Sequence, residues 1–332
     1  MITSSLAVAP LRISFVGGGS DIDSFFRHND GAVVSCAINK YVFVHVKVHD
    51  DSFGERYRIS YSKVEHVQEI FQIENEIVRA CLQFMEIDVP VQISTLSDLP
   101  AGTGLGSSSS FTVALLLALH SIKGQQPTRH QLAEEACHVE IELLKHPIGK
   151  QDQYAAAFGG LNFFQFLKNG RVIAEPISIS SKELSALLNR CRLYWTKTDR
   201  LAVKILEDQA VRISLNFDNL QKMVSLAYEF RELLEHADIN WGKLSNLINE
   251  SWNLKQGFSP LISTDPISDL INIIKKQKDY SAKLLGAGGG GFILSFNGSS
   301  ESTVNPKASP NFPQSSFTPL MDQSGARIIS TF

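Results

Sequence analysis

The stretch from Asp98 to Leu119, DLPAGTGLGSSSSFTVALLLAL, restricts the fold of this chain more than any other part of its sequence. Glycines alternate with small residues, four serines follow in a row, and then an apolar run begins. Glycine allows close approach of a ligand to the backbone, and a helix N-terminus exposes unpaired N–H groups that attract anions. The stretch therefore predicts a loop leading into a helix. The loop is either a phosphate-binding cradle or a flexible linker with a serine N-cap.

Neither of the two standard nucleotide-binding motifs accounts for the glycines. The loop at 102–108 lacks the Lys-Ser or Lys-Thr pair that ends a Walker A motif. The run GAGGGG at 286–291 satisfies G-x-G-x-x-G literally, but the strand sequence FILSF follows it where a helix is required. We therefore interpret the second run as a strand–turn–strand unit. Its glycines indicate close approach of a ligand or of another backbone, and a purely structural tight turn is the alternative.

Length and local patterns predict a two-domain protein of the α+β class. A chain of 332 residues exceeds one typical hydrophobic core, and we expect domains at 1–185 and 186–332. Segments rich in β-branched and aromatic residues predict strands at 6–16, 31–48, 55–61 and 89–95, a hairpin after residue 160, and a last strand in SGARIISTF. Helical patterns lie near 69–86, 111–122, 128–145, 181–190, 200–234 and 241–256. Strands and helices do not alternate strictly, which excludes a doubly wound sheet.

Charge and cysteine usage exclude several classes of function. The formal net charge is -3, which provides no electrostatic reason to expect a nucleic-acid or anionic-membrane partner. The four cysteines lie far apart and form no C-x-x-C pair, so we expect reduced, buried thiols and neither disulfides nor a zinc site. No apolar run reaches the roughly 18 residues of a membrane span, and the N-terminus lacks a signal-peptide pattern. We therefore expect a cytoplasmic protein.

Two further segments carry candidate catalytic side chains. Arg12 lies in the apolar strand of PLRISFVGGGSDID, and a buried guanidinium is costly unless it meets an anion. Asp21 follows the glycine turn of the same segment and could bond sugar hydroxyls. Asp152, in GKQDQY, would occupy the first turn of a short helix, where the helix dipole favours an ionised carboxylate. A structural Arg–Asp bridge and a surface capping aspartate remain the alternatives.

These segments, in this order, resemble the GHMP kinase family, which includes galactokinase, homoserine kinase, mevalonate kinase and phosphomevalonate kinase. The three family motifs correspond to PLRISFVGGGSD, PAGTGLGSSSS and KLLGAGGGGF, and the resemblance covers residues from about 8 to 296. It implies an N-terminal domain like that of ribosomal protein S5 and a ferredoxin-like C-terminal domain. It also implies that ATP and a sugar phosphate bind between the two domains.

The resemblance further implies roles for individual residues. Asp152 corresponds to the catalytic aspartate, and Arg12 to the residue that pairs with it near the transferred phosphoryl group. Magnesium would be bound by Ser108, or Ser107, and by Glu140. The residues implied for ATP are Gly102, Thr103, Gly104, Leu105, Gly106, Ser107 and Ser108. Those implied for the acceptor are Gly18, Gly19, Ser20, Asp21, Lys150, Arg200, Gly288, Gly289 and Gly290.

Within the family, PLRISFVGGGSD together with GKQDQYAAAFGGLNFF is most similar to one branch. That branch phosphorylates the anomeric hydroxyl of D-glycero-D-manno-heptose 7-phosphate to the 1,7-bisphosphate. L-fucokinase domains share similar motifs and are the main alternative, and a nucleotide-binding member without turnover is another. The 7-phosphate should need a basic pocket, for which Lys150, Arg200 and Lys255 are candidates.

The chain also departs from the family in two places. Lys197 stands where the family has a glycine shortly before Arg200, and 297–316 is polar where a helix is usual. We therefore assign no function to 297–316 and expect it to be irregular. A homodimer is one possible assembly.

Overall fold

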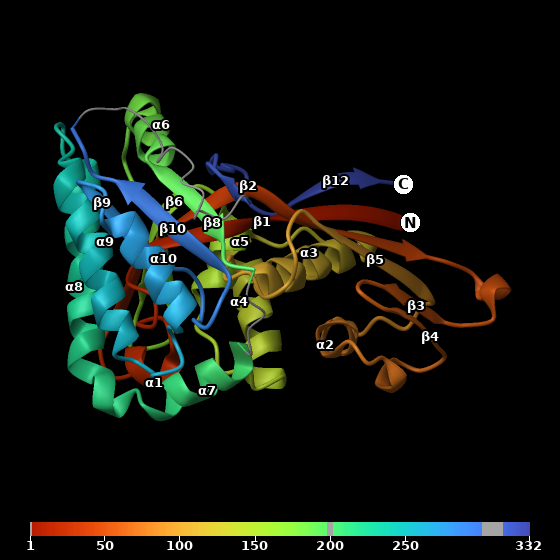
Figure 1. Cartoon of the computed structure of the whole chain (residues 1–332). Helices are drawn as coiled ribbons and strands as arrows, with labels where there is room; N and C mark the ends of the chain where they lie inside the picture. The colour runs from red at the N-terminus through yellow and green to blue at the C-terminus, as the bar shows by residue number, and fades with distance from the viewer. Residues whose placement is uncertain (1, 198–201, 301–314) are drawn as a thin grey trace.

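The computed structural model describes residues 2–197, 202–300 and 315–332, in which the strands form two separate sheets (Figure 1). The larger sheet has eight strands: β1 (Ser4–Val16), β2 (Gly31–Val48), β3 (Tyr57–Ser60), β4 (Val64–Val67), β5 (Val91–Ser97), β6 (Leu161–Phe166), β7 (Val172–Pro176) and β12 (Arg327–Thr331). The smaller sheet has the order β11-β8-β10-β9 and comprises β8 (Cys191–Trp195), β9 (Tyr280–Leu284), β10 (Phe292–Asn297) and β11 (Ser316–Phe317). The predicted α+β class is confirmed.

Helices cover both sheets and connect them. Those of the first half are α1 (Asp23–Phe26), α2 (Glu76–Phe84), α3 (Ser107–Ile122), α4 (Arg129–Cys137), the π-helix η3 (His138–Leu143), α5 (Gln151–Phe158) and α6 (Ser181–Asn189). Those of the second half are α7 (Ala202–Val211), α8 (Phe217–Glu235), α9 (Trp241–Gln256) and α10 (Asp265–Lys275). Figure 1 shows α8, α9 and α10 side by side at one end of the molecule. Helices α9 and α10 pack against β9 of the smaller sheet, whereas α8 packs against α9 and against β2 of the larger sheet. The larger sheet extends to the opposite end.

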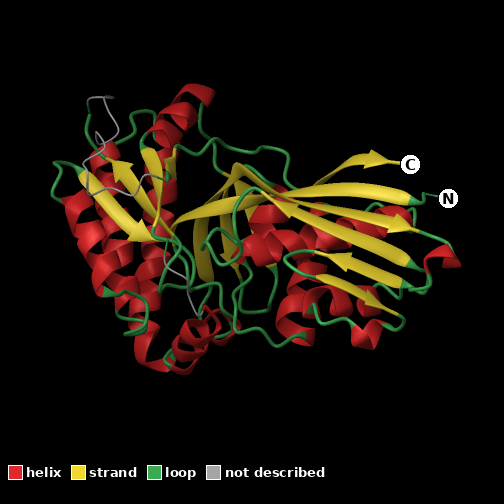
Figure 2. Cartoon of the chain, turned by 45° about the vertical axis from the view of Figure 1, so that its right-hand side comes forward, coloured by secondary structure: helices red, strands yellow, loops and turns green. Residues whose placement is uncertain are grey.

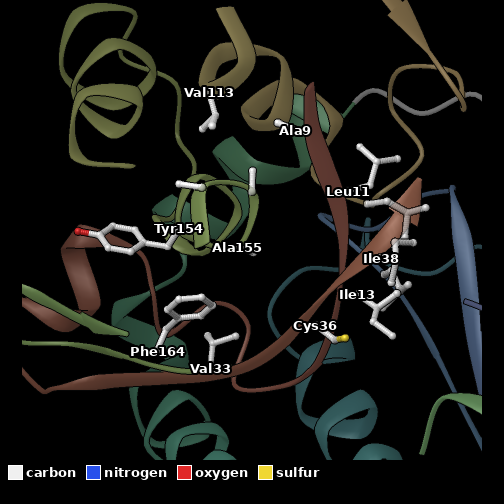
Figure 3. Packing of buried hydrophobic residues seen from close by; sticks show 14 of the residues in the cluster. Ala9, Leu11, Ile13, Val33, Cys36, Ile38, Val113, Tyr154, Ala155 and Phe164 are labelled. Atoms are coloured by element: carbon white, nitrogen blue, oxygen red, sulfur yellow. The ribbon is translucent and has the colours of Figure 1, made fainter. Parts of the chain in front are cut away.

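The strand β1 is buried along most of its length because helices from both halves of the chain cover it. Helices α3 and α5 contact it as well as α8 and α9. A strand buried on both faces is expected to have a near-continuous apolar sequence, as LAVAPLRISFV has. Figure 3 shows Leu11 and Ile13 of β1 beside Ile38 and Cys36 of β2 in this core. The one charged residue of β1, Arg12, is therefore placed in the interior between the two halves.

The two halves share further apolar contacts near the centre of the molecule. Buried residues of α8 recur at helical spacing, at Leu220, Met223, Ala227, Phe230 and Leu234. The Phe230 ring stacks on Phe15 of β1 with ring centroids 5.4 Å apart. Such aromatic stacking contributes about 0.5–1.5 kcal/mol beyond area burial, so it helps to hold the C-terminal helices against the first sheet.

Several secondary-structure predictions were wrong in detail. The helix expected over 200–234 is interrupted by a 3-10 turn at Ser214–Asn216, and α2 begins only at Glu76. The strands β4 and β8 and the helix α10 were not predicted. Of the segment 297–316, the residues 301–314 lie outside the described part of the chain. Short strands and a helix next to other helices leave weak periodic signals, which explains these omissions.

The last strand was predicted, but its partner was not. Strand β12 pairs with β1 in the larger sheet, and the backbone N–H of Thr3 donates to the carbonyl of Phe332 at 2.8 Å. Figures 1 and 2 accordingly show both chain ends at the same end of the molecule. The division at residues 185 and 186 stays a prediction, and the second half returns its last strand to the sheet of the first half.

The cysteines agree with the sequence interpretation. Cys36, Cys81, Cys137 and Cys191 are all buried free thiols. Across residues 2–197, 202–300 and 315–332, no helix combines the length and the apolar composition that a membrane span requires.

Candidate active site

A cavity of about 390 Å³ lies where the two halves of the chain meet. Its walls combine residues of β1, α3, α5, α9 and β9, namely Arg12, Ser108, Asp152, Lys255 and Lys283 among others. Three segments that are far apart in the sequence, at 10–23, 98–119 and 149–154, thus contribute to one site. The sequence motifs predicted this convergence.

The loop before α3 has the backbone of a phosphate cradle. Gly102, Gly104 and Gly106 have φ values of 76°, 83° and 80°, a left-handed conformation that L side chains rarely adopt. Gly106 is the N-cap of α3, and no side chain caps the helix, so the alternative of a serine N-cap is wrong. Ser107, Ser108 and Ser109 line the cavity in the first turn. The positive end of the helix dipole and its N–H groups therefore face the cavity, ready for an anion.

Two of the residues expected to hold ATP have a structural position instead. Thr103 and Leu105 are fully buried and do not line the cavity. The carbonyl of Leu105 accepts from the Arg12 backbone N–H at 2.9 Å, and that of Thr103 accepts from the Phe292 N–H at 2.9 Å. These bonds fasten the loop to β1 on one side and to β10 on the other.

The second glycine run packs against the first. A Cβ on Gly104 would lie 2.5 Å from the carbonyl oxygen of Leu285, and one on Gly291 would overlap the carbonyl of Thr103. Glycine is therefore required on both sides of this backbone contact. Close approach of another backbone was one of the alternatives that the sequence indicated for the second glycine run. Gly286 lines the cavity, whereas Gly288, Gly289 and Gly290 do not. A Cβ on Gly288 would clash with Ile262 and one on Gly289 with Ile205.

Arg12 and Asp152 form a two-pronged ion pair at the centre of the cavity. Arg12 Nε donates to Asp152 Oδ1 at 2.7 Å, and Nη2 donates to Oδ2 at 2.8 Å. Arg12 Nη1 donates to the carbonyl of Gly104 at 2.7 Å, which ties the pair to the glycine loop. The Arg12 side chain is 5% exposed and that of Asp152 is 24% exposed. The carboxylate therefore remains accessible to a molecule in the cavity.

Asp21 lies beside this pair in a cage of donors. Its carboxylate accepts from the backbone N–H of Gly19 at 2.9 Å and from Gln151, through the backbone N–H at 3.2 Å and Nε2 at 3.1 Å. A Cβ on Gly149 would overlap Asp21 Oδ2, so glycine is required there. Burial, and secondarily the charge of Asp152, raises the pKa of Asp21. Asp21 and the neighbouring Gly18 and Gly19 line the cavity.

Ser20, expected to contact the acceptor, is a turn residue instead. It is fully buried, and its hydroxyl donates to the carbonyl of Gly17 at 2.8 Å and to that of Ala32 at 3.0 Å. Ser20 does not line the cavity. Its position therefore supports the shape of the glycine turn between β1 and α1.

Ser108 and Glu140 meet in the lining of the same cavity. Ser108 Oγ donates to Glu140 Oε1 at 3.0 Å, and Gln153 Nε2 donates to Oε2 at 2.7 Å. Glu140 belongs to η3, and the wider π-turn interrupts the single helix that the sequence predicted for 128–145. Such π-turns often mark functional sites. Burial raises the pKa of Glu140, against the hydrogen bonds from Gln153, Ser109 and Ser108.

These two side chains are the donors available for a metal ion at the glycine loop. Among the described residues, no group of three or more His, Cys, Asp or Glu side chains could hold a metal. Mg²⁺ is usually held by one or two carboxylates together with phosphate oxygens and water. One hydroxyl and one carboxylate beside a phosphate cradle fit that donor set.

Of the three basic residues suggested for a phosphate pocket, Lys255 lines the cavity and Lys150 does not. Lys150 Nζ donates to the carbonyl of Gly170 at 3.2 Å, lies 3.6 Å from Glu134 and does not line the cavity. Arg200 lies outside the described residues. Lys255 lines the cavity and donates to the carbonyl of Gly286.

Lys283 is a cavity residue that sequence reasoning missed. It lies in β9 within YSAKLL and is 4% exposed. The signal was present in the sequence, because a single cation in an apolar strand is the same feature that singled out Arg12. The prediction for this segment rested on the glycines that follow Lys283.

Known proteins resemble this chain over most of its length. Family models described as the GHMP kinase N-terminal domain and the GHMP kinase C-terminal region match residues 74–160 and 226–302. The chain is 32% identical over 302 residues to D-glycero-alpha-D-manno-heptose 7-phosphate kinase of Campylobacter jejuni, covering 86% of this chain and 87% of that protein. It is 26% identical over 311 residues to the bifunctional fucokinase/GDP-fucose pyrophosphorylase of Arabidopsis thaliana, covering 86% of this chain and 29% of that protein.

The fold has a close match among solved structures. The crystal structure of a D-glycero-D-manno-heptose 1-phosphate kinase from Bacteroides thetaiotaomicron has a TM-score of 0.75 at 21% identity, covering 98% of this chain and 99% of that one. At this identity the match establishes the two-domain α+β fold, and the Campylobacter relative establishes the family. The chain belongs to the GHMP kinase family, the ATP-dependent phosphotransferases that act on a hydroxyl acceptor.

Proposed function

We propose that this protein phosphorylates the anomeric hydroxyl of D-glycero-D-manno-heptose 7-phosphate, with ATP as donor and the 1,7-bisphosphate as product. The observation that carries the proposal is the Arg12–Asp152 pair, which opens onto one cavity together with the N-terminus of α3. The choice of heptose 7-phosphate is supported by the name of the Campylobacter relative. The motifs around Asp21 and Asp152 support the same choice.

In the proposed reaction, Asp152 orients the acceptor hydroxyl and receives its proton. Each Asp152 oxygen already accepts from Arg12 but keeps a second lone pair for the acceptor. The acceptor oxygen forms a bond to the γ-phosphorus as the bond from that phosphorus to the β,γ-bridging oxygen breaks, which releases ADP. Arg12 and the N–H groups of α3 stabilise the charge on the phosphoryl oxygens.

Asp21 is proposed to hold the sugar. Its carboxylate is fixed by Gly19 and Gln151, so it is preorganised to accept hydrogen bonds from sugar hydroxyls. Asp21 lies close enough to Asp152 for their charges to interact, which supports a sugar bound by Asp21 with one hydroxyl near Asp152. Positioning of this kind supplies much of the acceleration in phosphoryl transfer.

Ser108 and Glu140 are proposed to hold Mg²⁺ together with the nucleotide. Glu140 is buried beside the phosphate cradle, and an unbalanced buried carboxylate calls for a cation. When bound, the ion neutralises charge on the β- and γ-phosphates. The protein contributes the position of the two side chains, which Gln153 fixes through its bond to Glu140.

A substrate screen with a coupled assay of ADP release tests the proposal. The acceptors are D-glycero-D-manno-heptose 7-phosphate, the unphosphorylated heptose, L-fucose and D-galactose, each with ATP and Mg²⁺. We expect turnover to depend on the 7-phosphate. Turnover of free fucose would favour a fucokinase, the alternative that the similarity to the Arabidopsis protein supports. Binding of ATP without turnover of any acceptor would favour a non-catalytic member of the family.

A further inference from the structure

Lys283 is a buried cation that has no carboxylate partner in the described part of the chain. Its ammonium donates to the carbonyl of Phe15 at 2.8 Å and lies 3.4 Å from the hydroxyl of Ser251. Over residues 2–197, 202–300 and 315–332, no Asp or Glu is within ion-pair distance of it. Taking an ammonium out of water without a counterion is costly. A residue of this kind, aimed into a cavity, is suited to an anion that arrives with the ligand.

The charged neighbours of Lys283 strengthen its preference for an anionic ligand. Lys255 and Arg12 line the same cavity, and after burial their charges are the further causes that hold the pKa of Lys283 well below its usual value. Arg12 is already neutralised by Asp152, whereas Lys283 has a backbone carbonyl and a hydroxyl as its hydrogen-bond partners among the described residues. A dianion between the two lysines would favour the charged form of both.

The position of the lysines favours the acceptor over the nucleotide. The nucleotide phosphates have the α3 N-terminus, Ser108 and Glu140 at their end of the cavity. Lys283 instead lies with Ser251 of α9. The cavity wall on that side continues through Phe258, and a Cβ on Gly19 would lie 3.1 Å from the Phe258 ring. Lys283 also donates to the carbonyl of Phe15, at the end of β1 that leads into the turn carrying Asp21, where the sugar is expected.

We propose that Lys283 and Lys255, with the hydroxyl of Ser251, form the subsite for a phosphate group that the acceptor already carries. The inference rests on the proposed function, because it requires a phosphorylated acceptor in this cavity. It assigns the sugar-phosphate specificity to β9 and α9 of the second half of the chain. Of the two lysines suggested from the sequence, Lys255 belongs to this proposed subsite and Lys150 does not.

The test is Lys283→Met, assayed with heptose 7-phosphate and with the unphosphorylated heptose at saturating ATP. Methionine keeps the length of the buried stem and removes the charge. We expect KM for the 7-phosphate to rise about 10- to 100-fold, the range of a lost charge-assisted hydrogen bond. For the unphosphorylated heptose, kcat/KM should change by less than about threefold. Lys255→Met and Ser251→Ala should likewise raise KM for heptose 7-phosphate more than they change kcat/KM for the unphosphorylated heptose.

A matched control and a binding measurement keep the test independent of folding. Lys123→Met removes another lysine that donates to a backbone carbonyl, that of Met85, far from the cavity lining, and should leave both acceptors unchanged. Thermal unfolding with and without heptose 7-phosphate reports binding even if Lys283→Met is inactive. A rise in the unfolding temperature of the wild type but not of the folded variant supports the subsite. An equal rise for both overturns it.

The remaining outcomes separate this inference from the proposed function. Equal losses on both acceptors, together with weaker binding of a non-hydrolysable ATP analogue, would assign the lysines to the transferred phosphoryl group and overturn the inference. Wild-type turnover of another sugar phosphate but not of heptose 7-phosphate would overturn only the proposed substrate, and the variant pair is then assayed on that sugar phosphate and its free sugar. A wild type that prefers free sugars to their phosphates would overturn the inference itself.

Discussion

Two buried cations that line the cavity, Arg12 and Lys283, have opposite electrostatic surroundings. Arg12 makes two charge-assisted hydrogen bonds to Asp152 and one bond to Gly104. Among the described residues, Lys283 has the carbonyl of Phe15 and the hydroxyl of Ser251 as partners and no carboxylate. Arg12 thus has its counterion within the protein, whereas under our proposal the counterion of Lys283 arrives with the acceptor. The difference supports the proposal that Arg12 and Asp152 take part in the chemistry and that Lys283 selects the acceptor.

The largest expected effect comes from removing the charge that Arg12 pairs with. Asp152→Asn keeps the shape of the side chain but loses its capacity to take the acceptor proton. We expect kcat to fall by at least about 100-fold, the lower end of general-base contributions. Calorimetric titration with a non-hydrolysable ATP analogue should show binding close to that of the wild type. Near-normal turnover would remove Asp152 from its proposed role.

A smaller loss is expected when the charge is kept and the geometry is changed. Arg12→Lys replaces a planar fork by a single ammonium, which cannot reach both Asp152 oxygens and the carbonyl of Gly104 together. We expect kcat/KM to fall about tenfold to 100-fold, in the range of one or two charge-assisted bonds. The change should appear in kcat for phosphorylated and free acceptors alike. A fall in kcat/KM that is confined to phosphorylated acceptors would show that Arg12, like Lys283, acts in selecting the acceptor.

The buried carboxylate of Glu140 provides a prediction about stability and pH. The raised pKa of Glu140 means that the folded state binds its proton more tightly than the unfolded state, so this residue favours folding below about pH 4.5 and loses that contribution as the pH rises through the raised value. Glu140→Gln should therefore increase the unfolding temperature at pH 7 in the absence of metal. The gain should shrink towards acid pH. Gln153 can turn its amide to accept from the new side chain, since its Oε1 has no partner.

The same variant should lose function as it gains stability. Without the carboxylate, we expect the Mg²⁺ concentration needed for half-maximal activity to rise about tenfold, as for a lost charged ligand contact. A magnesium titration of initial rates measures this shift. An unchanged requirement would show that Glu140 is only a buried structural acid.

The smallest effect is expected at Lys150, which the sequence placed in the acceptor site. Its ammonium contacts Gly170 and Glu134 away from the cavity lining, and a partly exposed ion pair contributes little. Lys150→Met should change KM for heptose 7-phosphate by less than about threefold, the equivalent of a weak surface ion pair. A rise in KM as large as that expected for Lys283→Met would instead assign the phosphate subsite to Lys150.

The sequence predicted some cavity residues better than others. Arg12, Asp152 and Ser108 come from segments with short-range signals, such as a cation in an apolar strand or serines after a glycine loop. Glu140 was implied only by the family resemblance. The structure brings each of them to the cavity. Ser20, Thr103 and Gly288 were chosen by their position in a motif and proved to be buried or to pack on other backbone. A motif marks a loop, but it does not separate the residues that face a ligand from those that shape the loop.

The sequence by itself determined the α+β class, the glycine loops, the cation in β1 and the carboxylate at the start of α5. These properties follow from backbone freedom, apolar periodicity and the cost of burying charge, all of which act over a few residues. Only the tertiary structure decided which cations face the cavity, that η3 turns Glu140 towards Ser108, and that β12 pairs with β1. These depend on contacts between segments as far apart as Phe15 and Lys283. No local pattern records a contact that forms only when the two halves of the chain pack together.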